Sequence, residues 1–463
     1  MHRKSHRKLI EMKVIITLLA GLCLSILLLY IGRERWLAAT PQPLPSKSTV
    51  SDGKNHGFPQ GRYYEVSIPF TSTTANKRSA DYRLWIPDGV KTLRGLIVKQ
   101  HGCGDSTAAT GLDHANDLQW QTLTLKHQFA ILGTKLPTGN PLCTDEAIAD
   151  RAAEDSFLIA LRNLAEKSHH PELDTVPWAL WGHSGGADWA MQMLRHYPAR
   201  VIAVANMRSG GIRGSSGKSE ILDLDPKSVS ALLAVPVLWT IGEKDPNVEE
   251  CITLPQQIFS KFRTAGAKWT LAIAAKTGHE SGDTRFLAIP YLDTMISTRL
   301  TSEGNRLSSI KSTQGWLGNT VTHTVAPIAS DRDNPLTVTW LPTEALAQKW
   351  QQYVNTGKIS PTRKPAMPTN VSATKISAKE VLITWNFTPD LEDGLPSFRI
   401  YRDNSLIATL SGQSHNFGDA PEPANVVLEF VDRNARTNSS HAVVAFNVVG
   451  ESISPSTLLG ENK

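Results

Sequence analysis

The sequence predicts an α/β fold, a doubly wound and mostly parallel sheet, followed by a smaller all-β domain. The first observation is that apolar runs alternate with helix-like segments from about residue 93 to residue 300. This alternation is typical of parallel strands whose connecting helices cover both faces of the sheet. The second observation is that only short strand-like segments recur after residue 368. The Pro-rich stretch 361–368 between the two parts has the composition of a stiff linker.

The amino terminus has the pattern of an export segment. Residues 14–31 are apolar and uncharged, and they lie between a basic head and a second pair of arginines. This pattern indicates a signal peptide or an uncleaved signal anchor within residues 1–36, with the rest of the chain exported. The protein would then be secreted, or anchored in the membrane with the domain that starts near residue 61 outside the cytoplasm. Residues 37–60 predict a flexible tether.

The formal net charge of +5 is concentrated in the same segment. Residues 1–31 account for +4 of it, so the rest of the 463-residue chain is nearly neutral. Because the body has no basic stripe, no nucleic-acid partner is expected. The membrane is an expected partner only through the amino-terminal segment, if that segment is uncleaved.

The elements of the first domain, residues 61–301, can be placed in order. Residues 63–70 and 82–86 alternate apolar and polar residues, which predicts two antiparallel edge strands. The remaining pattern predicts strands at 93–99, 129–136, 178–181, 200–207, 235–241 and 269–274, and helices near 113–127, 146–167, 187–194 and 284–300.

The strand at 178–181 ends abruptly in Gly-His-Ser-Gly-Gly, directly before a helix-like segment. Where a strand reverses into a helix within about two residues, glycines on both sides of the central Ser avoid a Cβ clash. Ser184 would therefore stand exposed at the tip of this turn. The backbone N–H of Gly185, at the start of the helix, is placed to donate to a developing oxyanion.

Two later strands lead into loops that carry an acid and a base. The acid is Asp245, with Glu243 as the alternative, and the base is His279. Because ligands bind at the carboxyl edge of a parallel sheet, we expect these side chains beside Ser184. Four neighbouring polar residues are interpreted as structural or surface groups: His101, His183, Asp188 and Glu280.

The order Ser, Asp, His along the chain resembles that of the α/β-hydrolase superfamily over roughly residues 62–300. The resemblance implies that Ser184 is the nucleophile and His279 the general base and acid. It also implies that Asp245 orients His279 and stabilises its cation. No cofactor is implied.

The apolar run before His-Gly-Cys-Gly, residues 101–104, resembles the third strand and oxyanion loop of many secreted esterases. This likeness implies that the oxyanion hole is formed by the backbone N–H groups of Cys103 and Gly185. We therefore expect an exported serine hydrolase that acts on carboxylic esters, free or polymer-linked, like extracellular polyester depolymerases and feruloyl esterases. The alternatives are a serine peptidase of the same fold, and a cell-surface binding or scaffold protein with an inactive hydrolase domain.

The cysteines give a further expectation. Three of the four lie outside the apolar segment, in loops that follow predicted strands: Cys103, Cys143 and Cys251. No CxxC or Cys/His ligand spacing occurs, so no metal is expected. Export favours one disulfide, for which the expected pair is Cys143 with Cys251.

Two regions follow the catalytic domain. Residues 302–360 contain three tryptophans and a Pro-initiated helix near 342–350, and they read as an extension packed on the catalytic domain or as a small lid, with packing favoured. Residues 369–458 resemble a fibronectin type III sandwich with Trp385 in its core, although His441 stands where that family usually has a corner tyrosine. A spacer role is expected for this domain.

Overall fold

The computed structural model describes residues 60–70, 78–137, 151–211, 219, 221–301, 306–311, 313–328, 337–392, 394–411, 418–420, 428–436 and 438–458. The predicted signal segment, most of the tether and Cys143 lie outside these residues. Among the residues described, no helix is both long and apolar enough to cross a membrane.

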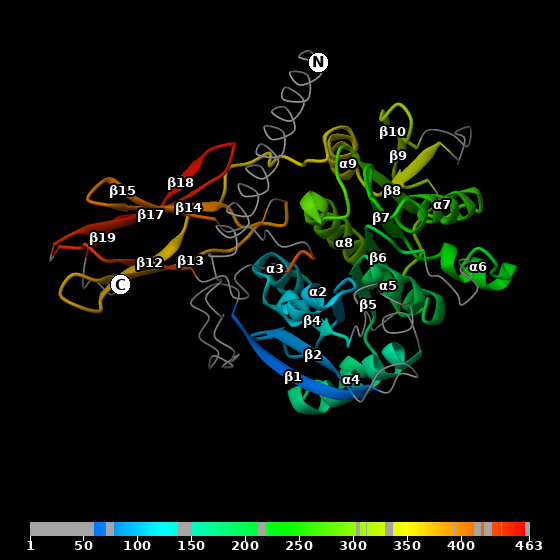
Figure 1. Ribbon diagram of the computed structural model, residues 1–463, viewed down its shortest axis with the longest axis horizontal. Coiled ribbons are helices and arrows are strands. Elements are labelled where there is room, and N and C mark those ends of the chain that lie inside the picture. Colours follow the sequence, from blue (N-terminus) through cyan, green and yellow to red (C-terminus); the bar gives the residue numbers. More distant parts are fainter. Residues whose placement is uncertain are drawn as a thin grey trace, which may run out of the picture. The chain divides into compact units, whose positions relative to one another are not determined.

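An eight-stranded sheet forms the centre of the first domain (Figure 1), with the strand order β1-β2-β4-β3-β5-β6-β7-β8. Neighbouring strands from β4 to β8 pair in parallel, and β2 pairs in antiparallel fashion with both β1 and β4. The predicted α/β fold with a mostly parallel sheet is therefore confirmed. The strands are β1 (Gly61–Phe70), β2 (Arg78–Pro87), β3 (Gly95–Gln100), β4 (Phe129–Lys135), β5 (Trp178–His183), β6 (Val201–Met207), β7 (Val237–Gly242) and β8 (Trp269–Ala274).

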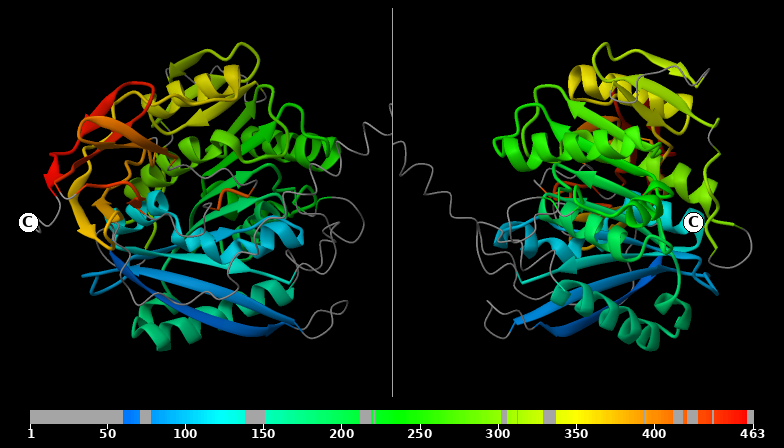
Figure 2. Two further views of the ribbon diagram at one scale, coloured as in Figure 1. Left: turned by 60° about the vertical axis from the view of Figure 1, so that its left-hand side comes forward. Right: turned by 90° about the vertical axis from the view of Figure 1, so that its right-hand side faces the viewer.

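Helices cover both faces of this sheet (Figure 2), because its strands are apolar on both sides. In β5, Trp178 and Leu180 enter one core while Ala179 and Trp181 enter the other. Helices α4, α5 and α7 pack in the first core, and α3, α8 and α9 in the second. The helices of this domain are α2 (Asp105–Ala109), α3 (Leu118–His127), α4 (Arg151–Ser168), α5 (Gly185–His196), α6 (Pro226–Leu233), α7 (Leu254–Thr264) and α8 (Arg285–Arg299).

The helix predicted near 113–127 is divided in the structure. A 3₁₀ helix, Gly111–Asn116, ends at Asp117, and α3 begins after it. The Asp117 side chain accepts from the N–H groups of Gln119 and Trp120, so it caps α3. A capping aspartate at this point ends one helical segment and starts another, which the apolar pattern alone does not show.

An extension of three short strands and one helix packs on the first domain. Strands β9 (Trp316–Asn319), β10 (Val325–Pro327) and β11 (Val338–Leu341) form an antiparallel sheet, followed by α9 (Glu344–Thr356). Thr343 caps the start of α9, and Gly357, with φ 72°, ends it. Trp340 and Trp350 are buried in the same core as α8, and Trp350 Nε1 donates to the Leu271 carbonyl at 2.7 Å. These residues therefore extend the core of the first domain.

The carboxyl-terminal part is a sandwich of two antiparallel sheets. One sheet has the order β12-β13-β16 and the other β15-β14-β17-β18, with β19 also paired to β17. Trp385 and Ile383 from the first sheet and Phe398 and Val443 from the second share one core. The strands are β12 (Thr369–Lys375), β13 (Val381–Asn386), β14 (Ser397–Arg402), β15 (Ser405–Leu410), β16 (Glu429–Asp432), β17 (Ser440–Phe446), β18 (Glu451–Ile453) and β19 (Thr457–Leu458).

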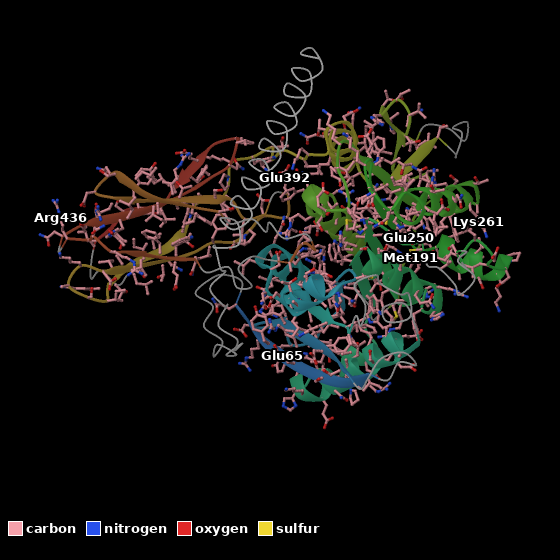
Figure 3. All side chains as sticks on the ribbon, viewed as in Figure 1. Glu65, Met191, Glu250, Lys261, Glu392 and Arg436 are labelled. Carbon is pink, nitrogen blue, oxygen red and sulfur yellow. The ribbon has the colours of Figure 1, made fainter. Side chains whose placement is uncertain are left out.

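The sandwich contacts the extension and the linker through Glu392, which Figure 3 labels. Its carboxylate lies 3.3 Å from Lys349 Nζ on α9 and accepts from the Thr362 hydroxyl at 2.7 Å. Further inside the sandwich, the buried His441 contacts Asp432 Oδ2 through Nε2 at 3.0 Å. The residue at the expected tyrosine corner, on β17, therefore bonds to β16 in the opposite sheet.

Candidate active site

Ser184 lies on a sharp turn between β5 and α5. Its φ of 53° is in the left-handed region, which is costly for a residue with a side chain. A Cβ on Gly182 would come within 2.0 Å of the Gly186 carbonyl oxygen, and one on Gly186 within 2.3 Å of the Gln100 carbonyl oxygen. Only glycine fits at these two positions, so the close packing of β5, α5 and β3 presents Ser184 at the tip of the turn.

A chain of hydrogen bonds joins Ser184, His279 and Asp245. Nε2 of His279 lies 2.8 Å from Ser184 Oγ, and Nδ1 lies 2.6 Å from Asp245 Oδ2. The other oxygen of Asp245 accepts from the N–H of Asn247 at 3.0 Å, and the aspartate side chain is fully buried. An imidazole held between a hydroxyl and a buried carboxylate can remove the hydroxyl proton, because the carboxylate stabilises the resulting cation.

The loop of Asp245 also carries the alternative acid, Glu243, which the structure directs elsewhere. Its carboxylate is exposed and accepts from the backbone N–H of Lys276 at 2.6 Å. A Cβ on Gly242 would come within 2.0 Å of the Gly278 carbonyl oxygen, so the loops after β7 and β8 lie against each other. Of the two carboxylates, the structure therefore brings Asp245 to the histidine.

The loop after β3 lies beside the Ser184 turn. A Cβ on Gly102 would come within 3.1 Å of the His183 carbonyl oxygen. The Thr107 hydroxyl lies 2.8–2.9 Å from the carbonyl oxygens of residues 102, 103 and 104, which closes this segment into a tight turn that we call the oxyanion turn. The oxyanion turn contains Cys103, and Gly185 is the first residue of α5, where N–H groups have no partner within the helix. The oxyanion role of these two N–H groups stays a prediction.

Two buried histidines support these loops. His101 donates from Nδ1 to the Gly102 carbonyl and accepts at Nε2 from the N–H of Leu136, which fixes the neutral ring in one tautomer. His183 donates from Nε2 to the His279 carbonyl at 2.8 Å. Burial lowers the pKa of His101 to about 4 and, together with the charge of His279, that of His183 to about 3. Both rings therefore stay neutral and hold the loops in place, in line with their interpretation as structural groups.

The other two polar neighbours also have structural contacts. Asp188 Oδ1 accepts from the Ser209 hydroxyl and from the N–H of Gly210, each at 3.0 Å. Glu280 is exposed and accepts from the N–H of Gly278 through its carboxylate. Both carboxylates bond to loop groups that follow strands of the central sheet.

A pair of residues that sequence reasoning missed braces the His279 loop. Arg208 directly follows β6, is fully buried and has φ 64°. Its Nε donates to the Glu280 carbonyl at 2.9 Å and its Nη2 to the Tyr353 hydroxyl at 3.1 Å. Tyr353 comes from α9, so the extension reaches the His279 loop. The sequence did contain one indication of this role. Arg208 follows an apolar strand at the edge of the sheet where the other site residues lie.

The cysteine pairing expected from the sequence is wrong. Cys103 is disulfide-bonded, whereas Cys251 is free and buried. Cys251 lies in a π-helical turn, Val248–Thr253, directly after the acid loop, and its side chain is directed into the interior beside Asp245 and His279. Loop position in the sequence did not show this inward direction. Burial, with nearby carboxylates, raises the pKa of the Cys251 thiol.

The same three side chains form a candidate metal-binding group. Among the described residues, one ligand atom each of Asp245, Cys251 and His279 lie within 4.8 Å of one another. The imidazole is already hydrogen-bonded on both sides, through Nδ1 to Asp245 and through Nε2 to Ser184. The geometry therefore fits a proton-transfer pair better than a metal centre.

No protein-family model and no curated protein matches the chain. Among solved structures, it is similar to a ferulic acid esterase at 14% identity, with 51% of this chain and 96% of that chain covered and a TM-score of 0.38. It is also similar to a dienelactone hydrolase from Anabaena variabilis (20% identity, 52% and 99% covered, TM-score 0.35) and to an S-formylglutathione hydrolase from Agrobacterium tumefaciens (14%, 51% and 94%, TM-score 0.34). Likenesses this distant carry no argument about activity, so the function is argued from the site.

Proposed function

We propose that this chain is an exported serine hydrolase of the α/β-hydrolase superfamily that cleaves carboxylic esters. The observation that carries the proposal is the hydrogen-bonded series Ser184, His279, Asp245 at the carboxyl edge of the parallel sheet. The strained turn at Ser184 supports it, because backbone strain of this kind is found where a reactive side chain must be presented.

The reaction proceeds through an acyl-enzyme. Ser184 Oγ attacks the ester carbonyl while His279 Nε2 takes its proton, and the buried Asp245 carboxylate stabilises the imidazolium. The N–H groups of Gly185 and Cys103 hold the oxyanion. His279 then protonates the leaving alcohol, and a water molecule, deprotonated by the same ring, releases the acid and restores Ser184.

The setting of the site supports export. A structural disulfide such as that of Cys103 is typical of oxidising compartments outside the cytoplasm. The proposal includes the amino-terminal signal segment. It also includes a sandwich of the fibronectin type III kind at residues 369–458, and the two antiparallel sheets with their shared core support this part of the proposal. The substrate is an ester, free or polymer-linked.

The test is labelling with a fluorophosphonate probe together with turnover of p-nitrophenyl acetate. The wild-type chain should label at Ser184 and hydrolyse the ester, and Ser184→Ala should lose both. Asp245→Asn should lower kcat by about 10⁴-fold, because His279 loses its orienting carboxylate. Glu243→Gln is the matched control on the same loop and should keep wild-type activity. A folded wild-type chain that neither labels nor hydrolyses esters would favour a binding role instead.

A further inference from the structure

Four charged side chains form a buried cluster where the sandwich meets the catalytic domain. Lys99, Asp117 and Arg285 belong to the catalytic domain, and Asp419 belongs to the sandwich, in the segment between β15 and β16. Their exposed fractions are 0%, 4%, 6% and 3%. Arg285 Nε lies 2.7 Å from Asp419 Oδ1, and its Nη2 lies 2.7 Å from Asp117 Oδ2. Charges this deeply buried are tolerated only when they are paired.

The two cations depend on the sandwich to different degrees. Arg285 also bonds to a carboxylate of its own domain, Asp117. Lys99 Nζ instead donates to Asp419, to Oδ2 and to the backbone carbonyl, each at 3.2 Å. Burial lowers the pKa of Lys99, and Asp419 opposes that shift. Without Asp419 the ammonium would keep the ring faces of Trp120 and Trp181, 4.5 and 4.6 Å from their centroids, but no direct carboxylate partner within the described part of the chain.

The partner of Asp419 lies close to the catalytic groups. Lys99 is on β3, four residues before Cys103. On the sandwich side, a Cβ on Gly418 would come 3.7 Å from Cγ2 of Thr107, whose hydroxyl closes the oxyanion turn. One short sandwich segment, Gly418 and Asp419, therefore bonds to the strand that leads into the oxyanion turn and lies near the residue that closes it.

The sandwich has further contacts with the catalytic domain that do not involve Asp419. Gln119 Nε2 on α3 donates to the Asp390 carbonyl at 3.2 Å, and Leu118 is part of the sandwich core. Glu392 adds its contacts with Lys349 and Thr362. Substitution of Asp419 therefore removes the carboxylate that pairs with Lys99 and Arg285 while leaving these docking contacts in place.

We propose that Asp419 is a positioning residue for the ester hydrolysis proposed above. Through Lys99 it fixes the end of β3, the strand that leads into the oxyanion turn, so the sandwich holds this turn in place. The sandwich thus contributes to catalysis by positioning the oxyanion turn. This role goes beyond the spacer role expected from the sequence. The inference rests on the proposed function.

The experiment compares Asp419→Asn with wild type in the full chain. The concentration of active sites is first titrated with the fluorophosphonate, so that kcat with p-nitrophenyl acetate is expressed per competent Ser184. We expect Asp419→Asn to lower kcat by about ten- to a hundredfold with KM nearly unchanged, because a slightly displaced oxyanion turn weakens binding of the transition state more than of the substrate. Glu392→Gln, which loosens docking elsewhere, is the matched control and should keep the wild-type kcat.

A second variant keeps the test decisive if Asp419→Asn fails to fold. Lys99→Met combined with Asp419→Asn removes both charges at similar volume and should be folded, because no unpaired charge remains in the core. It also lacks the Lys99–Asp419 bond, so its kcat per active site should stay lowered, and a wild-type kcat in this folded variant would overturn the inference. A wild-type kcat per active site in Asp419→Asn would overturn the inference and leave the proposed function standing. An unreactive wild-type chain would instead overturn the proposed function.

Discussion

The buried histidines should make this protein lose stability as the pH falls. Burial lowers the pKa of His101 to about 4 and that of His183 to about 3, and it lowers the pKa of His114 well below its usual range. In the unfolded chain each of these rings takes up a proton near pH 6.5. Below that pH the unfolded state binds more protons than the folded state, so the free energy of unfolding decreases with decreasing pH.

The size of the effect follows from the same pKa values. Between pH 7.5 and pH 5, linkage gives a loss of about 2 kcal/mol for His101 and about 2 kcal/mol for His183. His114 contributes a further loss of the same sign. The total is a large part of the ~5–15 kcal/mol that stabilises a typical domain. The loss begins near pH 6.5 and continues down to the folded-state pKa values, about 3 to 4.

Urea unfolding followed by tryptophan fluorescence at pH 7.5, 6.5, 5.5 and 5 measures this dependence. His114→Phe is the informative variant, because its ring can keep the edge contact with Trp181, whose centroid lies 5.4 Å away, while one titratable group is removed. The variant should lose less stability over this range than the wild type. A wild-type free energy of unfolding that changes by less than about 1 kcal/mol between pH 7.5 and pH 5 would refute the assignment of buried neutral rings.

Three further substitutions test the packing around the site. Gly186→Ala should abolish most esterase turnover, because the added Cβ would come within 2.3 Å of the Gln100 carbonyl oxygen. Steady-state kinetics and a melting curve would check this. A fully active variant would contradict it. Tyr353→Phe should lower the free energy of unfolding by about 1 kcal/mol, because the buried Arg208 loses a hydroxyl partner. Urea unfolding measures this change. An unchanged urea midpoint would argue against the bond. Cys251→Ser should retain activity. The native Cys251 thiol should react slowly with iodoacetamide, as measured by mass spectrometry, because burial raises its pKa. Rapid labelling would contradict its buried position.

Local patterns in the sequence were enough to predict the fold class and the elements that carry the site. Apolar runs bounded by Gly and polar residues mark β5, β7 and β8, and parallel strands share one carboxyl edge, so loops far apart in sequence were expected to meet there. The structure brings Ser184, Asp245 and His279 together at that edge. The choice between Asp245 and Glu243 needed coordinates, since both lie on one turn and only direction separates them.

Contacts between distant segments could not be predicted in this way. The cysteine pairing failed because position in a loop does not say whether a side chain faces inward. Lys99 was counted within a predicted strand, but nothing local indicates a carboxylate 320 residues later. Arg208 and Tyr353 are 145 residues apart and meet only because α9 packs on the core. Each of these contacts depends on tertiary packing, which periodicity does not encode.

The late position of Asp419 has a consequence for the order in which the protein can mature. A chain that is synthesised and moved across a membrane from its amino end delivers Lys99 and Ser184 long before Asp419. During that interval the Lys99 ammonium has no partner from the sandwich and favours a hydrated, open arrangement of the core around β3. When the sandwich folds against the first domain, Asp419 pairs with Lys99 and the core around β3 can pack. The domain that is synthesised last thus completes the packing of the domain that is synthesised first. Under the proposed export, the chain would therefore complete its proposed hydrolytic site only after Asp419 has crossed.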